Sequence, residues 1–238
     1  MARSKNIGVL GLIPARGGSK GIPRKNLADL CGKPLIQYTF ESALRSRELD
    51  RVILSTDDGE IAALGRRCGV EVPFMRPKAL AEDRTPMAPV VEHALGWLQE
   101  AEGGMCDAVA LLQPTSPLCR SRDIDGAVGA FREGGMDAVV GVCEPREHPF
   151  DMLVPGERGA RFLIPNDRGC RQEFPTCYYV NGAIYVTASR VLLEQHTFFP
   201  ERMGIFPMDW ISSFDIDTPL DLEIAAAFLR LRKEGGGP

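Results

Sequence analysis

The sequence lacks the patterns that mark several large functional classes. No apolar run approaches the roughly 20 residues that a membrane-spanning helix needs, so we expect no membrane partner. Histidine occurs three times in 238 residues and the seven cysteines form no C-x-x-C pair, which argues against the common zinc patterns. Neither G-x-x-x-x-G-K-[ST] nor G-x-G-x-x-G occurs, which disfavours P-loop ATPases and nicotinamide-dependent enzymes.

The chain also lacks a strong excess of charge of one sign. Its formal net charge is −4, so we expect no nucleic acid as a partner. An anionic small molecule would therefore need a local basic cluster to bind. The odd number and irregular spacing of the cysteines indicate free thiols, which are typical of a reducing compartment, and we expect a cytoplasmic protein.

Apolar runs and amphipathic segments alternate over the first 143 residues. This alternation predicts a three-layer, Rossmann-like α/β fold with a mostly parallel sheet and helices on both faces. The ligand should lie beyond the carboxyl ends of the strands. The expected strands are Gly8–Ile13, Val52–Ser55, Val70–Pro73, Asp107–Leu112 and Asp137–Cys143, and the expected helices are Pro34–Arg45, one between Asp57 and Gly69, Ala88–Glu100, and Arg122–Glu133 behind a Ser121 cap.

The alternation breaks at residues 144–177, which are rich in Pro, Gly, Arg and Glu. A structureless loop of this length is unusual in a compact domain, so we expect an excursion of short strands that contributes to a dimer and to the acceptor site. Beyond it, Tyr178–Thr187 and Ser213–Asp217 are expected as strand segments, and Thr218 as the cap of a last helix. We expect one domain over residues 5–233 and a disordered tail at 234–238.

A glycine-rich basic loop follows the first strand, within Ile13–Asn26. It carries four cations, Arg16, Lys20, Arg24 and Lys25, and three glycines that allow the backbone to approach a ligand. Placed at the end of a first strand, such a loop predicts a phosphate-binding site.

Two aspartates, Asp215 and Asp217, form the second chemical feature. In an extended segment, residues two apart point to the same side, so the two carboxylates should face one spot. Their like charges would repel unless a cation lies between them, and carboxylates with substrate phosphates are preferred ligands of Mg²⁺. The loop and the pair together predict a polyphosphate held near a magnesium ion, which suits displacement at phosphorus.

Five ordered segments carry a resemblance to a known family. They are Ile13–Asn26, Ser55–Asp57, Leu112–Leu118, Asn181–Tyr185 and Asp215–Leu222. In these segments the chain resembles the acylneuraminate cytidylyltransferases, over about residues 7–231. The resemblance implies a nucleotidyltransferase fold, a homodimer, and transfer of CMP from CTP to an anionic acceptor with release of pyrophosphate.

The resemblance also implies residue roles. Ala15, Gly17, Arg16, Ser19, Lys20 and Lys25 would form the nucleotide phosphate site, with Asn26 near the nucleoside. Arg76 and the loop Leu80–Thr85 would read cytosine. Gln113, Asn181 and Arg171 would lie on the acceptor side, Arg171 facing a carboxylate. Asp215 and Asp217 would hold Mg²⁺, and Asp217 would help to deprotonate the acceptor hydroxyl.

One residue departs from the family pattern. Asp151 stands where some members that use sialic acid carry a lysine, and an aspartate would repel the carboxylate of an acidic sugar. We therefore expect Neu5Ac to be a secondary substrate. Sialic and legionaminic acids, other keto-acid sugars and a small phosphonate remain open as acceptors, and so do a different nucleoside triphosphate and a non-catalytic role in nucleotide-sugar binding.

Overall fold

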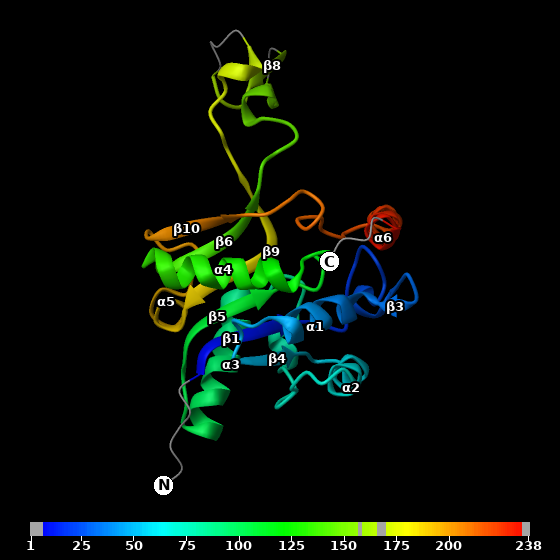
Figure 1. The fold of residues 1–238 in the computed structure, drawn as a ribbon, viewed down its shortest axis with the longest axis vertical. Coiled ribbons are helices and arrows are strands. Elements are labelled where there is room, and N and C mark those ends of the chain that lie inside the picture. The colour runs from blue at the N-terminus through cyan, green and yellow to red at the C-terminus, as the bar shows by residue number, and fades with distance from the viewer. Residues whose placement is uncertain (1–6, 157–158, 166–169, 235–238) are drawn as a thin grey trace.

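The computed structural model describes residues 7–156, 159–165 and 170–234, and its centre is a six-stranded sheet (Figure 1). The strand order is β10-β6-β9-β5-β1-β4. Strand β9 runs antiparallel to β5 and β6, and the other pairings are parallel. The bounds are β1 Ile7–Pro14, β4 Arg51–Ser55, β5 Cys106–Leu112, β6 Ala138–Cys143, β9 Tyr179–Ala188 and β10 Met203–Pro207.

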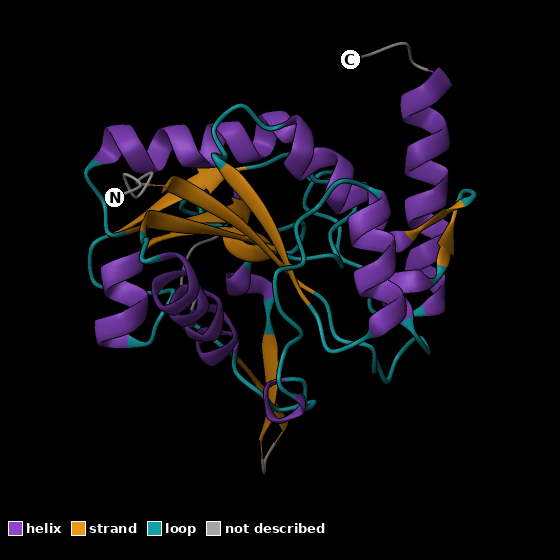
Figure 2. Cartoon of the chain, turned by 90° about the horizontal axis from the view of Figure 1, so that it is seen from below, coloured by secondary structure: helices purple, strands orange, loops and turns teal. Residues whose placement is uncertain are grey.

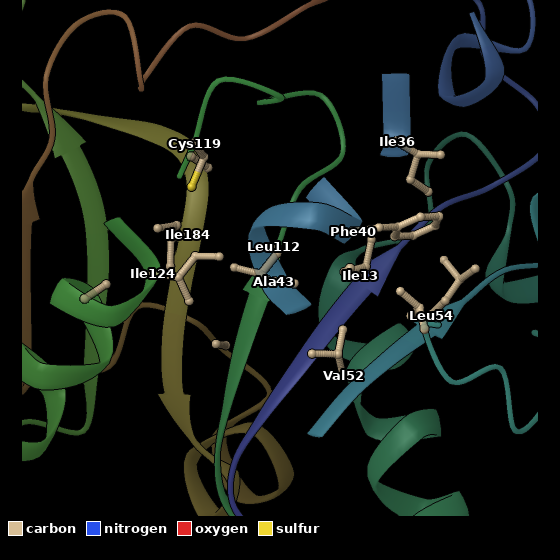
Figure 3. Packing of buried hydrophobic residues seen from close by; sticks show 14 of the residues in the cluster. Ile13, Ile36, Phe40, Ala43, Val52, Leu54, Leu112, Cys119, Ile124 and Ile184 are labelled. Atoms are coloured by element: carbon tan, nitrogen blue, oxygen red, sulfur yellow. The ribbon is translucent and has the colours of Figure 1, made fainter. Parts of the chain in front are cut away.

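Two helix layers cover the sheet, as Figure 2 shows. One layer contains α1 Leu35–Arg45, α2 Gly59–Arg67 and α4 Ser121–Gly134. The other contains α3 Met87–Glu102 and α5 Ser189–Gln195. In the first layer Phe40 and Ile36 pack on buried strand residues such as Ile13 and Leu54 (Figure 3), which follows from their helical spacing. The expected three-layer fold with a mostly parallel sheet is confirmed.

A third apolar cluster lies beside the sheet and involves the last helix, α6 Pro219–Glu234. Ala225 of α6 packs with Ile22 of the basic loop and with Ile216, which lies between the two aspartates. The short hairpin β2 Asp29–Leu30 and β3 Lys33–Pro34 joins this cluster through Leu30. This apolar contact brings the basic loop and the acidic segment to one place, although they are about 190 positions apart in the sequence.

Residues 144–156, 159–165 and 170–178, which we call the arm, leave the sheet between β6 and β9 and project away from the rest of the chain (Figure 1). Strands β7 Leu153–Gly156 and β8 Gly159–Phe162 form an antiparallel hairpin in the arm. The short helices η3 Pro149–Asp151 and η4 Arg171–Glu173 flank the hairpin. The tail residues 235–238 lie outside the described residues.

Three local expectations were wrong. Val70–Pro73 makes only a single bridge, between Glu71 and Ile53, because Pro73 has no N–H to extend a ladder. Ser213–Asp217 is a turn and an irregular segment, since it crosses the carboxyl edge of the sheet and pairs with no strand. Ser121 is the first residue of α4 rather than its cap.

At that helix start the cap position is Arg120, whose backbone N–H donates to the Asp123 carboxylate at 2.9 Å. Helix α5 and strand β10 are short, and the sequence pattern did not predict them. Within the described ranges, no helix combines the length and apolar character needed to cross a bilayer.

Candidate active site

The basic loop turns over the carboxyl ends of β1 and β4 and is tied to them by backbone hydrogen bonds. Ala15 N donates to the carbonyl of Ser55 at 2.9 Å, and Gly17 N donates to the Asp57 carboxylate at 3.0 Å. Only glycine fits at position 17, since a Cβ there would lie 2.7 Å from the Asp58 carboxylate. The loop therefore has a fixed path at the sheet edge where α/β proteins bind ligands.

Ser19 and Lys25 organise the far side of the loop. The Ser19 hydroxyl donates to the carbonyl of Ile22 at 2.8 Å and accepts from Lys25 N at 2.8 Å. The Lys25 ammonium donates to the carbonyl of Ile216 at 2.7 Å and lies 3.0 Å from Asp217 Oδ1. The basic loop and the acidic segment are therefore in direct contact, which the proposed chemistry requires.

Two cavities open at this edge of the sheet. The first, the cationic cavity, measures about 420 Å³ and is lined by Arg16, Lys20, Lys25, Asn26, Arg76 and Asp217 among others. The second, the acceptor cavity, measures about 420 Å³ and is lined by Asn181, Tyr185 and Asp215 among others. Gln113 and Thr115 line both. The two cavities therefore adjoin, and each has one carboxylate of the acidic pair in its wall.

The two carboxylates stand in different surroundings. Asp217 is exposed and pairs with Lys25, whereas Asp215 is half-buried and accepts from the Ser116 hydroxyl at 3.2 Å. Burial raises the pKa of Asp215, and the neighbouring charge of Asp217 raises it further. Between them Ile216 is fully buried and its N–H donates to the carbonyl of Thr115 at 2.9 Å. This anchor fixes both carboxylates relative to the wall that the cavities share.

Arg76 lies deeper than its predicted role in reading a base would suggest. Its side chain is only 4% exposed, and its guanidinium donates to the Ser55 hydroxyl at 3.1 Å and to the Ser55 carbonyl. Burial lowers the pKa of Arg76 to about 10. Arg76 lines the cationic cavity, and its bonds to Ser55 also hold the end of β4 in place. The backbone N–H of Arg76 donates to the backbone carbonyl of Thr56.

Asn26 and Asn181 are buried and their amides are bonded to the protein. Asn26 Nδ2 donates to the carbonyl of Arg16 at 2.9 Å, which fixes the start of the loop. Asn181 Nδ2 donates to the Ser213 hydroxyl at 2.9 Å, and its Oδ1 accepts from Ala183 N at 3.0 Å. Asn26 lines the cationic cavity and Asn181 lines the acceptor cavity. Through these hydrogen bonds, each side chain also holds the neighbouring groups of the protein in place.

Two further residues were predicted on the acceptor side, Gln113, which lines both cavities, and Arg171. Gln113 directly follows β5, and its N–H bonds to Ala183 at 3.2 Å. Arg171 begins η4 in the arm, and its side chain lies outside the described residues. Thus the structure gathers the predicted residues other than Arg171 around the adjoining cavities, by lining or by the hydrogen bonds above.

Sequence reasoning missed several residues of the site. Thr115 and Tyr185 fall inside the segments that carry the family resemblance, so that signal could have found them. Asp83 bonds to Arg16 and to Lys20, each at 2.6 Å. It lies in the loop Leu80–Thr85, which the resemblance assigns to cytosine, but no spacing rule singles it out there, because it is one of several charges in a polar loop.

Comparison with known proteins gives a consistent result. The sequence model of a family described as cytidylyltransferase matches residues 10–232. The pseudaminic acid cytidylyltransferase of Campylobacter jejuni is 34% identical over 94% of this chain and 97% of that protein. The CMP-N,N'-diacetyllegionaminic acid synthase of Legionella pneumophila is 31% identical over 95% of this chain and 98% of that protein.

A solved structure of CMP:2-keto-3-deoxy-manno-octonic acid synthetase complexed with CTP superposes with a TM-score of 0.73. The alignment covers 94% of this chain and 99% of that chain, at 21% identity. At this identity the likeness concerns the fold alone.

Proposed function

The chain belongs to the cytidylyltransferase family and is a CTP-dependent nucleotidyltransferase, and we propose that it transfers CMP from CTP to a nine-carbon acidic sugar with release of pyrophosphate. The acceptor class we propose is the nonulosonic acids, of the pseudaminic, legionaminic or sialic type. The observation that carries the proposal is the pair of adjoining cavities with a shared wall at Gln113 and Thr115. One cavity offers cations to a polyphosphate, and its neighbour has room for a sugar.

The cationic cavity is the proposed CTP site. Arg16, Lys20 and Lys25 line it, and charge-assisted hydrogen bonds from such groups to phosphate oxygens are strong. Ser19 would contribute by holding Lys25 in place, because its hydroxyl accepts a hydrogen bond from the Lys25 backbone N–H. Arg76 and Met87 line the same cavity and lie outside the basic loop in the sequence, and we place the nucleoside toward them.

Magnesium is the proposed cofactor, and the residues present fit it. Among the described residues, no group of three or more His, Cys, Asp or Glu could enclose a metal alone. Mg²⁺ is commonly bound by one or two carboxylates with substrate phosphates and water, so Asp215 and Asp217 are a sufficient protein contribution. When bound, the ion would neutralise charge on the phosphate oxygens.

The chemistry then follows from the positions of the groups. An oxygen of the acceptor hydroxyl forms a bond to the α-phosphorus of CTP, while the bond to the bridging oxygen of the β-phosphate breaks. Arg16, Lys20 and Lys25 stabilise the charge on the leaving pyrophosphate. The resemblance assigns the hydroxyl proton to Asp217. Because Asp215 is the residue of the pair that lines the acceptor cavity, we place that proton on the Asp215 carboxylate.

The arm supports a proposed homodimer. Its hairpin and the residues on either side of the hairpin expose apolar side chains, namely Met152, Leu153, Phe162, Leu163 and Ile164. An exposed apolar group of this size is typical of a protein–protein contact. In such a dimer we propose that the arm of one protomer approaches the acceptor cavity of its partner. Asp151, in η3 of the arm, is the residue on which the expectation of a slower reaction with Neu5Ac rests.

The test is a panel of substrates. CTP, UTP, GTP and ATP are each combined with pseudaminic, legionaminic and sialic acids, shorter keto-acid sugars and small phosphonates, and pyrophosphate release is measured. We expect activity with CTP and a nonulosonic acid, with Neu5Ac slower than the best acceptor. Preference for another nucleotide, or for a phosphonate, would refute the proposal.

The acidic pair gives a second test. Asp215→Ala and Asp217→Ala should each lower turnover by more than about 100-fold, because each removes a proposed ligand of the magnesium ion that would neutralise charge at the transferred phosphoryl. Circular dichroism should show an unchanged fold. Wild-type rates in both variants would overturn the assignment of the pair.

A further inference from the structure

Asp83 lies in the loop between η2 Lys78–Leu80 and α3, and each of its carboxylate oxygens contacts a different cation of the basic loop. Oδ1 is 2.6 Å from Arg16 Nη1, and Oδ2 is 2.6 Å from Lys20 Nζ. Both cations line the cationic cavity. An anion supplied by the protein itself therefore engages two groups that we assign to the nucleotide.

These ion pairs are at the solvent-exposed side of the cavity. The Lys20 side chain is 81% exposed and that of Asp83 is 38% exposed. The Lys20 ammonium, together with Arg16, holds the pKa of Asp83 below its usual range, so the carboxylate is charged at neutral pH. Exposed ion pairs of this kind are weak, and a stronger anion can replace the carboxylate.

The backbone around Asp83 is bonded mainly to its own loop. Thr85 N donates to the carbonyl of Glu82 at 3.2 Å, and the Thr85 hydroxyl donates to the carbonyl of Ala79 at 3.3 Å. Residues 82–84 form the tip of this loop. Among the interactions described for them, the two ion pairs of Asp83 connect the tip to the basic loop. If the cations find another partner, the tip can therefore separate without breaking a strand or a helix.

We propose that Asp83 is an internal competitor of the polyphosphate: the phosphates of CTP displace its carboxylate from Arg16 and Lys20, and its return to them promotes release of pyrophosphate. The inference rests on the proposed function, since it takes a triphosphate as the ligand of these cations. No bond is made or broken in this exchange. One set of charge-assisted hydrogen bonds replaces another.

The proposal predicts that Asp83 affects the binding of ligands that carry phosphate groups and not of ligands that lack them. Asp83→Asn keeps the size of the side chain but removes its charge, so pyrophosphate and CTP should bind about three- to tenfold more tightly, the range that weak exposed ion pairs allow. Cytidine, which has no phosphate, should bind as in wild type. The inhibition constant of pyrophosphate should fall by the same factor, and kcat should not rise.

The experiment is calorimetric titration of wild type and variants with inorganic pyrophosphate, CTP and cytidine, in magnesium-containing buffer. Glu60→Gln is the matched control, because Glu60 pairs at 2.8 Å with Arg24, a cation of the same loop that is not in the cavity lining. Pyrophosphate binding should be unchanged in this control. Asp83→Ala is a second variant with the same expected result as Asp83→Asn, in case one of them folds poorly.

The outcomes distinguish two failures. If wild type binds neither CTP nor pyrophosphate, the proposed function fails. If wild type binds both but Asp83→Asn and Asp83→Ala bind pyrophosphate equally or more weakly, Asp83 only orders its loop and the competitor role is refuted. An equal gain for cytidine would also refute it, because the effect would then be independent of phosphate.

Discussion

Gly21 offers a sharp test of the contact between the basic loop and the acidic segment. A Cβ added at Gly21 would lie 2.4 Å from the backbone carbonyl oxygen of Asp217. Ordinary carbon–oxygen contacts are about 3.3–3.6 Å, so the two segments must separate by about 1 Å in Gly21→Ala. A misplacement of about 1 Å in a reacting assembly can lower the rate about 100-fold, equivalent to about 2.7 kcal/mol in the activation barrier.

The assay for Gly21→Ala is steady-state pyrophosphate release with CTP and the best acceptor, accompanied by thermal melting. We expect kcat/KM to fall about 100-fold and stability to fall by about 1–3 kcal/mol, the range for overpacking. Gly59→Ala is the control, because its Cβ would meet nothing within 4 Å. Activity of Gly21→Ala within about threefold of wild type, with an unchanged Tm, would show that the loop and the acidic segment need not touch.

Three further predictions concern stability and assembly. Asn181→Ala leaves the Ser213 hydroxyl without its buried partner, so the free energy of unfolding should fall by about 1–3 kcal/mol in denaturant titration; no change would exclude the bracing role. Arg51 holds the pKa of Glu102 below its usual value, so this carboxylate adds stability at neutral pH that is lost as the pH falls through the lowered pKa. The Tm of Glu102→Gln should therefore lie below that of wild type at neutral pH, and the difference should vanish in acid. A difference that grows in acid would contradict this pH dependence. Leu153→Asp, at a side chain 57% exposed in the arm, should convert dimers to monomers in sedimentation, whereas Leu220→Asp, 67% exposed on α6, should not; equal behaviour would exclude the arm as the contact.

Much of the fold was predictable because its signals are local. The buried strand β1, which is parallel to both of its neighbours, is a continuous apolar run, and α1 places Ile36, Phe40 and Ala43 on one face. The segment at 213–217 was misassigned because alternation in sequence does not reveal whether a neighbouring strand is available. In the structure, the N–H of Ile216 in this segment donates to the carbonyl of Thr115, which is about 100 positions away in the sequence.

The site was predictable as a set of residues but not as a set of contacts. Residue type and order pointed to Arg16, Lys25 and Asp217, and the resemblance to cytidylyltransferases is confirmed. The ion pairs of Asp83, and the burial of Arg76 against Ser55, depend on how distant loops pack. A linear sequence carries no periodicity for such contacts, so only the folded chain reveals them.

The way the arm is joined to the sheet has an architectural consequence. Its two ends continue directly into neighbouring strands, and Cys143 of β6 pairs with Tyr179 of β9. The arm is thus an enlarged hairpin connection, and a tight turn could replace it without changing the order or direction of any strand. On our proposal that the arm provides the dimer contact and approaches the acceptor, both properties could therefore change without altering the sheet that carries the cationic cavity.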